Sequence, residues 1–245
     1  MTHGDFVWCD LSTLRPSVTQ PFYRRLFGWR WDELSQADGS AYHVASLGPD
    51  AIAGLFEMPV RFRDLGLPSF WMSYIAVDDA DAATVRAEEH GGRVEVGPLQ
   101  SWGGARIALI RDPLGAGFTV IEGGDLPARA ARPAVGTMAW NALYVGDASA
   151  VIPFYEALFR WRVGPASAGV SPIISERGSA ISDIHELDES LRGKPQYWAV
   201  HFAVAELAWA RSAVIGSGGE IVYEDAESVL ANDPDGAAFF LSPGT

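Results

Sequence analysis

The chain of 245 residues repeats its own pattern once. Three landmarks occur in the same order in both halves. They are a Pro-Phe-Tyr segment that continues to Leu-Phe and Trp-Arg, a Gly-Gly pair, and an Asp-Pro-x-Gly turn followed by a Phe. They occupy residues 21–30 and 153–162, 91–92 and 218–219, and 112–118 and 233–239. An internal repeat of this kind indicates a duplicated structural unit, and it constrains every other assignment.

The repeat predicts two domains, residues 1–124 and residues 137–245. The segment between them, residues 125–136, has Gly and Pro near both ends and no apolar periodicity. Such composition is typical of a linker. Each domain is long enough to enclose a core of its own.

Within each half, apolar patterning predicts a strand, a helix and further strands, and then the same succession again. The first helix should end at Phe27, because Gly28 is a favourable C′ residue. A second helix should begin after Asp78 or Asp79, which can cap it. We therefore predict an α+β fold of four βαβββ units, arranged as two tandem domains. Each domain is expected to be a cup-shaped mixed sheet with its helices on the outside.

Composition excludes several classes of partner. The net charge is −13, and no basic stripe is present to neutralise phosphates, so we expect no nucleic-acid partner. Cys9 is the only cysteine, which rules out an intrachain disulfide and a cysteine-based zinc site. No apolar run approaches the ~20 residues of a membrane span, and the N-terminus does not resemble a signal peptide. The expectation is a cytoplasmic monomer or homodimer without a membrane partner.

The ordered set of landmarks, together with Val77-Asp78-Asp79 after a strand, resembles the vicinal oxygen chelate superfamily. This superfamily contains glyoxalase I, bleomycin-resistance proteins and extradiol dioxygenases. Because both halves carry the set, the resemblance covers nearly the whole chain. Trp29, Trp71 and residues 116–118 resemble the tandem glyoxalase-like proteins of actinobacteria and proteobacteria. The resemblance implies a small-molecule partner and, in the metal-dependent members, a divalent ion that chelates two neighbouring substrate oxygens.

The metal ligands of the resembled family are His or Gln on the first strand, His or Glu on the strand before Val-Asp-Asp, and Glu on the last strand. At these positions the chain has Trp8, Met72 and Thr119 in the first half, and Trp140, Ala199 and Phe240 in the second. None of these side chains suits a divalent metal. A register error of one residue would turn each side chain to the other face of its strand. We therefore predict no metal and no other cofactor.

The same positions, with the polar residues two places along, form the predicted ligand-binding set: Trp8, Asp10, Met72, Tyr74, Thr119, Trp140, Ala199, His201 and Phe240. Aromatic walls suit planar or apolar ligands, although such a cavity can also be filled by its own side chains. Asp10 and His201 are the weak candidates for acid–base catalysis. The alternatives are that Asp10 caps the end of its strand and that His201 is a core histidine.

These observations predict a metal-free protein that binds a small apolar or aromatic molecule, in a sequestering or accessory biosynthetic role. The alternative is a metal-dependent enzyme of the glyoxalase or dioxygenase type with atypical ligands, which would make it a lyase or a dioxygenase. A third interpretation is an enzyme without a metal that uses Asp10 or His201.

Overall fold

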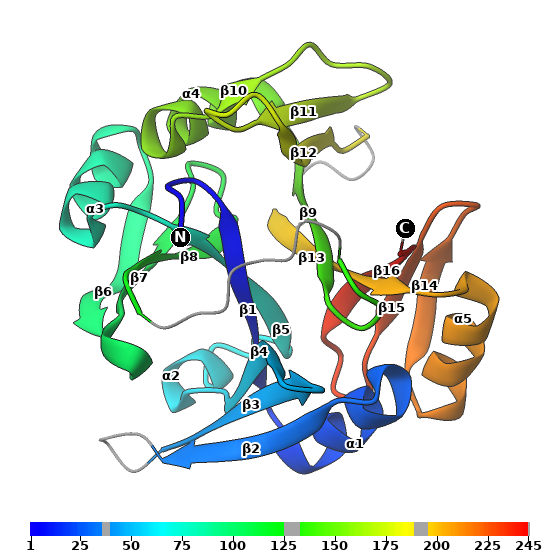
Figure 1. The fold of residues 1–245 in the computed structure, drawn as a ribbon. Helices are drawn as coiled ribbons and strands as arrows, with labels where there is room; N and C mark the ends of the chain where they lie inside the picture. Colours follow the sequence, from blue (N-terminus) through cyan, green and yellow to red (C-terminus); the bar gives the residue numbers. More distant parts are fainter. Residues whose placement is uncertain (36–39, 125–132, 189–195, 245) are drawn as a thin grey trace. The chain divides into compact units, whose positions relative to one another are not determined.

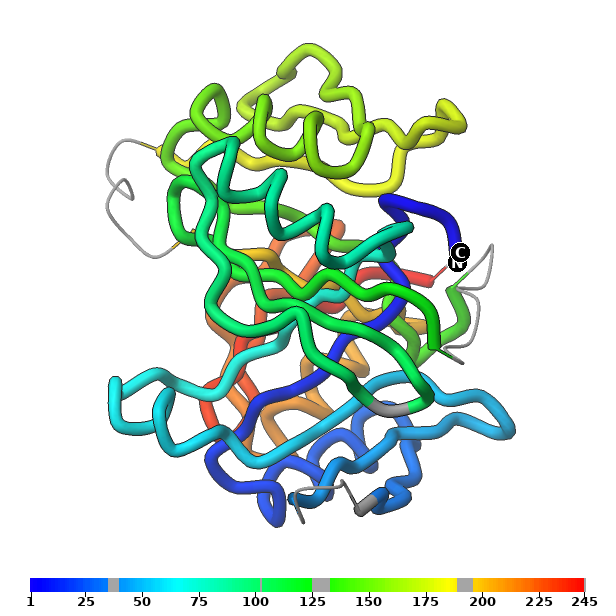
Figure 2. The backbone as a smooth tube through the Cα atoms, turned by 90° about the vertical axis from the view of Figure 1, so that its left-hand side faces the viewer, coloured from blue at the N-terminus to red at the C-terminus, as the bar shows by residue number. Residues whose placement is uncertain are grey.

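A computed structural model describes residues 1–35, 40–124, 133–188 and 196–244, and the remaining segments are drawn in grey (Figures 1 and 2). Its strands form two eight-stranded sheets, in the orders β2-β3-β4-β1-β5-β8-β7-β6 and β10-β11-β12-β9-β13-β16-β15-β14. Parallel and antiparallel neighbours occur in both sheets. The predicted α+β fold with mixed sheets and βαβββ units is therefore confirmed.

The first sheet contains β1 (Phe6–Thr13), β2 (Arg30–Ser35), β3 (Ala41–Leu47), β4 (Asp50–Glu57), β5 (Phe70–Ala76), β6 (Arg93–Gln100), β7 (Arg106–Arg111) and β8 (Gly117–Glu122). The second contains β9 (Met138–Val145), β10 (Arg162–Val163), β11 (Val170–Ile174), β12 (Ala180–Glu186), β13 (Tyr197–Val204), β14 (Glu220–Glu224), β15 (Val229–Asn232) and β16 (Ala238–Pro243). The helices are α1 (Pro16–Phe27), α2 (Val60–Arg63), α3 (Ala80–Glu89), α4 (Ala148–Phe159) and α5 (Leu207–Gly216), with a 3₁₀ turn at Trp102–Gly104. Within the described ranges, no helix is long and apolar enough to cross a membrane.

The contacts of the chain group it into two compact units, and each unit combines segments from both sequence halves. Unit 1 consists of residues 1–7, 73–128 and 140–199, and unit 2 of residues 8–72, 129–139 and 200–245. The predicted domain boundaries at 124 and 137 follow the two sheets rather than these units, and they stay a prediction. Residues 125–132 of the predicted linker lie outside the described residues.

Each compact unit contains one pair of helices in contact, and the packing near that pair explains why the Gly-Gly landmark occurs in both halves of the sequence. In unit 2, α1 contacts α5, and in unit 1, α3 contacts α4 (Figures 1 and 2). A Cβ atom on Gly219 would lie 2.9 Å from the ring of Phe22, and one on Gly92 would press on the ring of Phe154. The second glycine of each pair is therefore needed because a phenylalanine from the other half of the sequence packs on it.

The aromatic and Asp-Pro landmarks meet in the same way inside unit 2. The Tyr23 hydroxyl donates a hydrogen bond to Asp233 Oδ2 at 3.1 Å and accepts one from Trp71 Nε1 at 2.9 Å. All three side chains are buried. Tyr23 lies in the first half of the sequence and Asp233 in the second, so this bond joins the two repeats.

Unit 1 contains the reciprocal arrangement. The Tyr155 hydroxyl donates to Asp112 Oδ2 at 3.0 Å and accepts from Trp198 Nε1 at 2.9 Å. Here the tyrosine comes from the second half and the aspartate from the first. In each unit the Tyr and the Trp come from one half of the sequence and the Asp comes from the other half. These hydrogen bonds account for the presence of all three residues in both halves.

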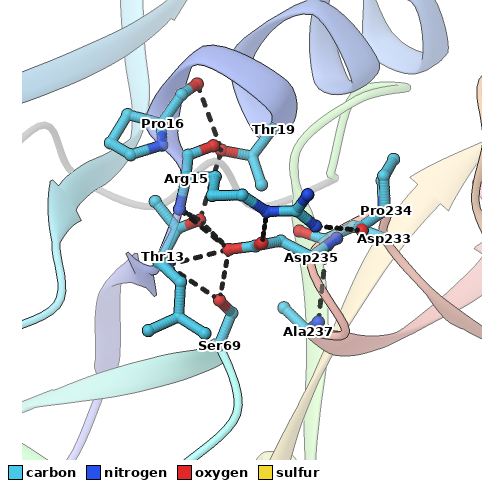
Figure 3. A network of polar contacts seen from close by, with 10 residues as sticks. Thr13, Arg15, Pro16, Thr19, Ser69, Asp233, Pro234, Asp235 and Ala237 are labelled. Carbon is cyan, nitrogen blue, oxygen red and sulfur yellow. Dashed lines mark hydrogen bonds and ion pairs between the residues drawn. The ribbon is translucent and has the colours of Figure 1, made fainter. Parts of the chain in front are cut away.

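The helix α1 receives its N-terminal cap from a distant residue. Its own N-cap residue, Arg15, makes no side-chain capping bond. Instead Asp235 Oδ2 accepts hydrogen bonds from the backbone N–H groups of Leu14 at 2.8 Å and Arg15 at 3.0 Å (Figure 3). The same oxygen accepts from the hydroxyls of Thr13 and Ser69, each at 2.6 Å, and Oδ1 accepts from Arg15 Nε at 2.6 Å. Burial raises the pKa of Asp235, but these hydrogen bonds outweigh it and lower the pKa to about 2.

Asp233 and Asp112, which accept hydrogen bonds from the two tyrosines, make the free energy of unfolding depend on pH in the opposite sense to Asp235. Burial raises the pKa of Asp233 from 3.8 to about 6, and burial also raises the pKa of Asp112. The folded state therefore binds more protons than the unfolded state between these two pKa values of Asp233. We expect the free energy of unfolding to fall by up to ~3 kcal/mol as the pH rises from about 4 to about 6.

Urea unfolding across this pH range checks the expectation. The Asp233→Asn variant, which cannot ionise, should show a shallower fall than the wild-type protein. An identical slope in both proteins would contradict the assignment to Asp233.

Candidate functional site

The predicted ligand residues of the first half are buried, with the exception of Met72. Every residue of β1 is buried. The Trp8 indole Nε1 donates to the Tyr42 hydroxyl at 3.0 Å. That hydroxyl lies over Gly54, where a Cβ atom would clash with it, and Gly54 is the register partner of Asp10. Trp8, Asp10 and Tyr42 are all at most 5% exposed, so the chain's own side chains fill this part of the face.

Asp10 does not cap a strand end. Its strand β1 continues to Thr13, so the capping interpretation is wrong. The other predicted residues of the first half lie on two neighbouring strands. Tyr74 on β5 pairs with Thr119 on β8, and both are buried in unit 1. Met72 is half-buried and belongs to unit 2.

In the second half the carboxylate belongs to Asp183 on β12, whereas in the first half it belongs to Asp10 on β1. Trp140 corresponds to Trp8 in the repeat, and its Nε1 donates to Asp183 Oδ2 at 3.1 Å. Asp183 on β12 is the register partner of Ala142 on β9, just as Gly54 is the partner of Asp10. The first half thus has Asp beside Gly, whereas the second has Ala beside Asp.

A row of stacked rings crosses three neighbouring strands of unit 1. Tyr144 on β9 stacks on Tyr197 of β13, with ring centroids 5.3 Å apart and planes at 18°. On its other side Tyr144 stacks on His185 of β12, at 4.7 Å and 23°. His185 is also the register partner of Tyr144, and its Nε2 lies 3.0 Å from Asp183 Oδ1. The aromatic row and the carboxylate therefore belong to one face of the sheet.

This face is more open than its counterpart in the first half. The side chains of Asp183 and His185 are 23% and 31% exposed, and Trp140 and Tyr144 are half-buried. The alternate residues of β12, Ser182 and Ile184, are fully buried. Polar and aromatic groups on this face can therefore contact a molecule from solvent.

The remaining predicted residues of the second half fall on β13 and β16. Ala199 is buried in unit 1. In unit 2, His201 pairs with Phe240, and their rings stack at 4.4 Å with planes 7° apart. His201 Nδ1 also lies 3.1 Å from the Ser242 hydroxyl.

A cavity of about 550 Å³ opens elsewhere in unit 1, beside the start of α4. Its lining includes Ser149, Ser171 and Glu186, but none of the predicted ligand residues. Glu186 accepts a hydrogen bond from the backbone of Ala148, and Asp147 caps α4. The polar groups at this helix end are thus partly satisfied by the protein itself.

The side chains at the metal-ligand positions that the resemblance implies do not fit a divalent metal. Trp8 and Trp140 present indole N–H groups, which only donate hydrogen bonds, and both are used in that way. The other positions offer a thioether, a hydroxyl, a methyl group and a phenyl ring. Among the described residues, no three or more His, Cys, Asp or Glu side chains form a group that could hold a metal ion.

Asp183 and His185 were not part of the predicted site. The available signal was the alternation of Asp and His in residues 180–186, which puts both on one face if the segment is a strand. Their link to Trp140 could not be predicted, because it depends on the pairing of β12 with β9.

Comparison with known proteins shows what the chain is similar to. Residues 10–120 match the family model described as the Glyoxalase/Bleomycin resistance protein/Dioxygenase superfamily. The matched segment lies within the first half of the sequence. The resemblance inferred from the repeated landmarks is therefore confirmed.

Curated relatives match this chain over almost its whole length. A Mycobacterium bovis protein named "Putative glyoxylase CFP32" is 28% identical over 242 residues, which cover 95% of this chain and 92% of the relative. The Streptomyces peucetius anthracycline biosynthesis protein DnrV is 28% identical over 255 residues, covering 96% and 92%.

Solved structures share the fold at low sequence identity. The Mn(II)-bound glyoxalase from Novosphingobium aromaticivorans aligns with a TM-score of 0.68 at 12% identity, over 99% of this chain and 83% of that one. The 2,3-dioxygenase LapB from a Pseudomonas species aligns with a TM-score of 0.66 at 12% identity, over 100% and 93%.

Proposed function

We propose that this protein binds a small planar aromatic molecule on the partly exposed face of β9, β12 and β13 in unit 1. The observation that carries the proposal is the row formed by Tyr197, Tyr144 and His185. Because His185 and Tyr197 cover the two faces of Tyr144, a flat ligand that lies across the row meets the ring edges, and edge-to-face contact is favourable between aromatic groups. Trp140 and Asp183 would line the adjacent part of the same face.

Burial favours the second half of the sequence over the first as the binding half. Trp8, Asp10, Tyr74 and Thr119 are at most 8% exposed, so they offer little surface to a ligand. Their assignment to a binding site, and that of Met72, stays a prediction. Ala199 is buried in unit 1, and His201 and Phe240 belong to unit 2, so their assignment to a binding site also stays a prediction.

We also propose that binding proceeds without the divalent metal of the metal-dependent relatives, because the donor set does not suit one. A sequestering or accessory biosynthetic role fits such a protein, and two of its relatives are named for anthracycline biosynthesis. The alternative, an enzyme with atypical metal ligands, predicts stoichiometric metal in protein purified without chelator. We expect substoichiometric metal instead.

A matched pair of variants tests the proposed site. A panel of planar aromatic compounds is screened by tryptophan fluorescence, and the affinity of each hit is then measured by equilibrium dialysis. Trp140→Phe should weaken binding about 3- to 10-fold, because it removes one indole contact. Trp8→Phe changes the equivalent residue of the first half and should leave the affinity unaltered.

Two results would count against the proposal. One is the absence of binding by every compound in the panel. The other is a loss of affinity in Trp8→Phe as large as that in Trp140→Phe, with both variants shown to be folded by circular dichroism.

A further inference from the structure

We infer that His185 is the group that recognises the ligand, and that it does so by accepting a proton from a phenolic or enolic hydroxyl. This inference rests on the proposed function, because it concerns the same face of unit 1. It adds the chemical class of the ligand: a planar aromatic molecule that carries an acidic hydroxyl group.

The hydrogen bonds around Asp183 orient the imidazole. Asp183 Oδ2 accepts from Trp140 Nε1, and Oδ1 lies 3.0 Å from His185 Nε2. Because a carboxylate only accepts hydrogen bonds, the Nε2 atom must carry the hydrogen. In a neutral imidazole the lone pair is then on Nδ1, as in other Asp–His pairs that act as bases.

Among the described residues, the contacts of the His185 ring nitrogens are made through Nε2 and not through Nδ1. Nε2 is held by Asp183, and no hydrogen bond reaches Nδ1 from the residues that the structure describes. The side chain is 31% exposed, so a ligand can approach it. Stacking on Tyr144 fixes the plane of the His185 ring, and it therefore fixes the direction of the Nδ1 lone pair, which lies in that plane.

The first half has neither member of the pair, which argues against a purely structural requirement of the fold. Its strand β4 has Gly54 opposite Asp10 and Phe56 opposite Ser12. In the second half β12 has Asp183 opposite Ala142 and His185 opposite Tyr144. Phe56 packs against Tyr42, at 6.3 Å between ring centroids. The repeat therefore accepts a phenylalanine where the second half has an ionisable imidazole.

The proposed step is a reversible proton transfer. The ligand's O–H bond breaks, its electron pair stays on the oxygen, and the proton passes to His185 Nδ1. The resulting imidazolium is neutralised by the Asp183 carboxylate. No oxidant, reductant or further reactant is needed.

Two probe compounds separate this inference from the proposed function. The first is 2-hydroxyanthraquinone, whose visible absorption changes when its phenol loses the proton, and the second is 2-methoxyanthraquinone, which has no such proton. Wild-type protein should bind the hydroxyl compound about tenfold or more tightly than the methoxy compound. The bound hydroxyl compound should show the phenolate spectrum at a pH where the free compound is neutral.

Variants at Asp183 and His185 test whether these two residues cause the preference for the hydroxyl compound. His185→Phe, which introduces the residue of the first half, should bind both compounds equally and without the phenolate spectrum. Asp183→Asn should reduce the preference and the phenolate signal. If His185→Phe does not fold, as judged by circular dichroism, His185→Gln replaces it and should lose the phenolate signal likewise.

Equal affinity of wild-type protein for the two compounds would overturn the inference and leave the proposed function standing. So would a phenolate signal that persists in a folded His185 variant. If wild-type protein binds neither these compounds nor any in the aromatic panel, the proposed function and this inference both fail.

Discussion

Replacing Asp235 by Ala should lower the free energy of unfolding by about 3–5 kcal/mol. The Asp235 carboxylate caps α1 and accepts from two hydroxyls, two backbone N–H groups and the Arg15 side chain. Its removal leaves buried donors such as the Thr13 hydroxyl without their acceptor, and unsatisfied buried groups are expensive. Urea unfolding followed by circular dichroism measures the loss.

The repeat supplies the control. Leu114 occupies the position of Asp235 in the first Asp-Pro-x-Gly turn, and the helix of the second half, α4, is capped by its own Asp147. Leu114→Ala should therefore change stability by less than about 0.5 kcal/mol, as expected for a surface position. A similar loss in both variants would show that Asp235 does not act as the cap of α1.

The low pKa of Asp235 also makes the free energy of unfolding depend on pH in the acid range. Its folded-state pKa of about 2 lies below the ordinary 3.8. The stability that this carboxylate contributes is therefore fully present above about pH 4 and is lost as the pH falls toward 2. The wild-type protein should lose more stability over this range than Asp235→Ala does.

Replacing Tyr23 or Tyr155 by Phe should each lower the free energy of unfolding by about 2–4 kcal/mol. Each hydroxyl bridges a tryptophan N–H and an aspartate carboxylate in a buried site. Without the hydroxyl, both partners lose a hydrogen bond where no water replaces it easily. The comparison variant is Tyr223→Phe, at a tyrosine that is 56% exposed, which should lose less than about 0.5 kcal/mol.

The same pair of variants tests the reciprocal contacts between repeats. Because Tyr23 lies in unit 2 and Tyr155 in unit 1, their effects should be nearly additive in the double variant. A loss no larger than that of the surface variant Tyr223→Phe would show that these hydroxyls do not carry the stability assigned to them.

Duplication has left the two halves with different surfaces at matching positions. In the first half Trp8 bonds to Tyr42 and the face is covered, whereas in the second Trp140 bonds to Asp183 and the face stays partly exposed. Moving the carboxylate from the strand of Asp10 to that of Asp183 requires only that one strand exchange Asp for Ala and the other Gly for Asp.

Local residue patterns were enough to predict the repeated βαβββ order and the α+β class, because these depend on periodicity, helix ends and turn residues. Asp79 as the cap of α3 and the strand Met138–Val145 follow from neighbouring residues alone. Three further features emerged only from the folded chain: the bond from Tyr23 to Asp233, the capping of α1 by Asp235, and the meeting of Asp183 and His185 with Trp140 on the more open face. These contacts depend on strand register and on packing between segments far apart in the chain, and local patterns carry no information about either.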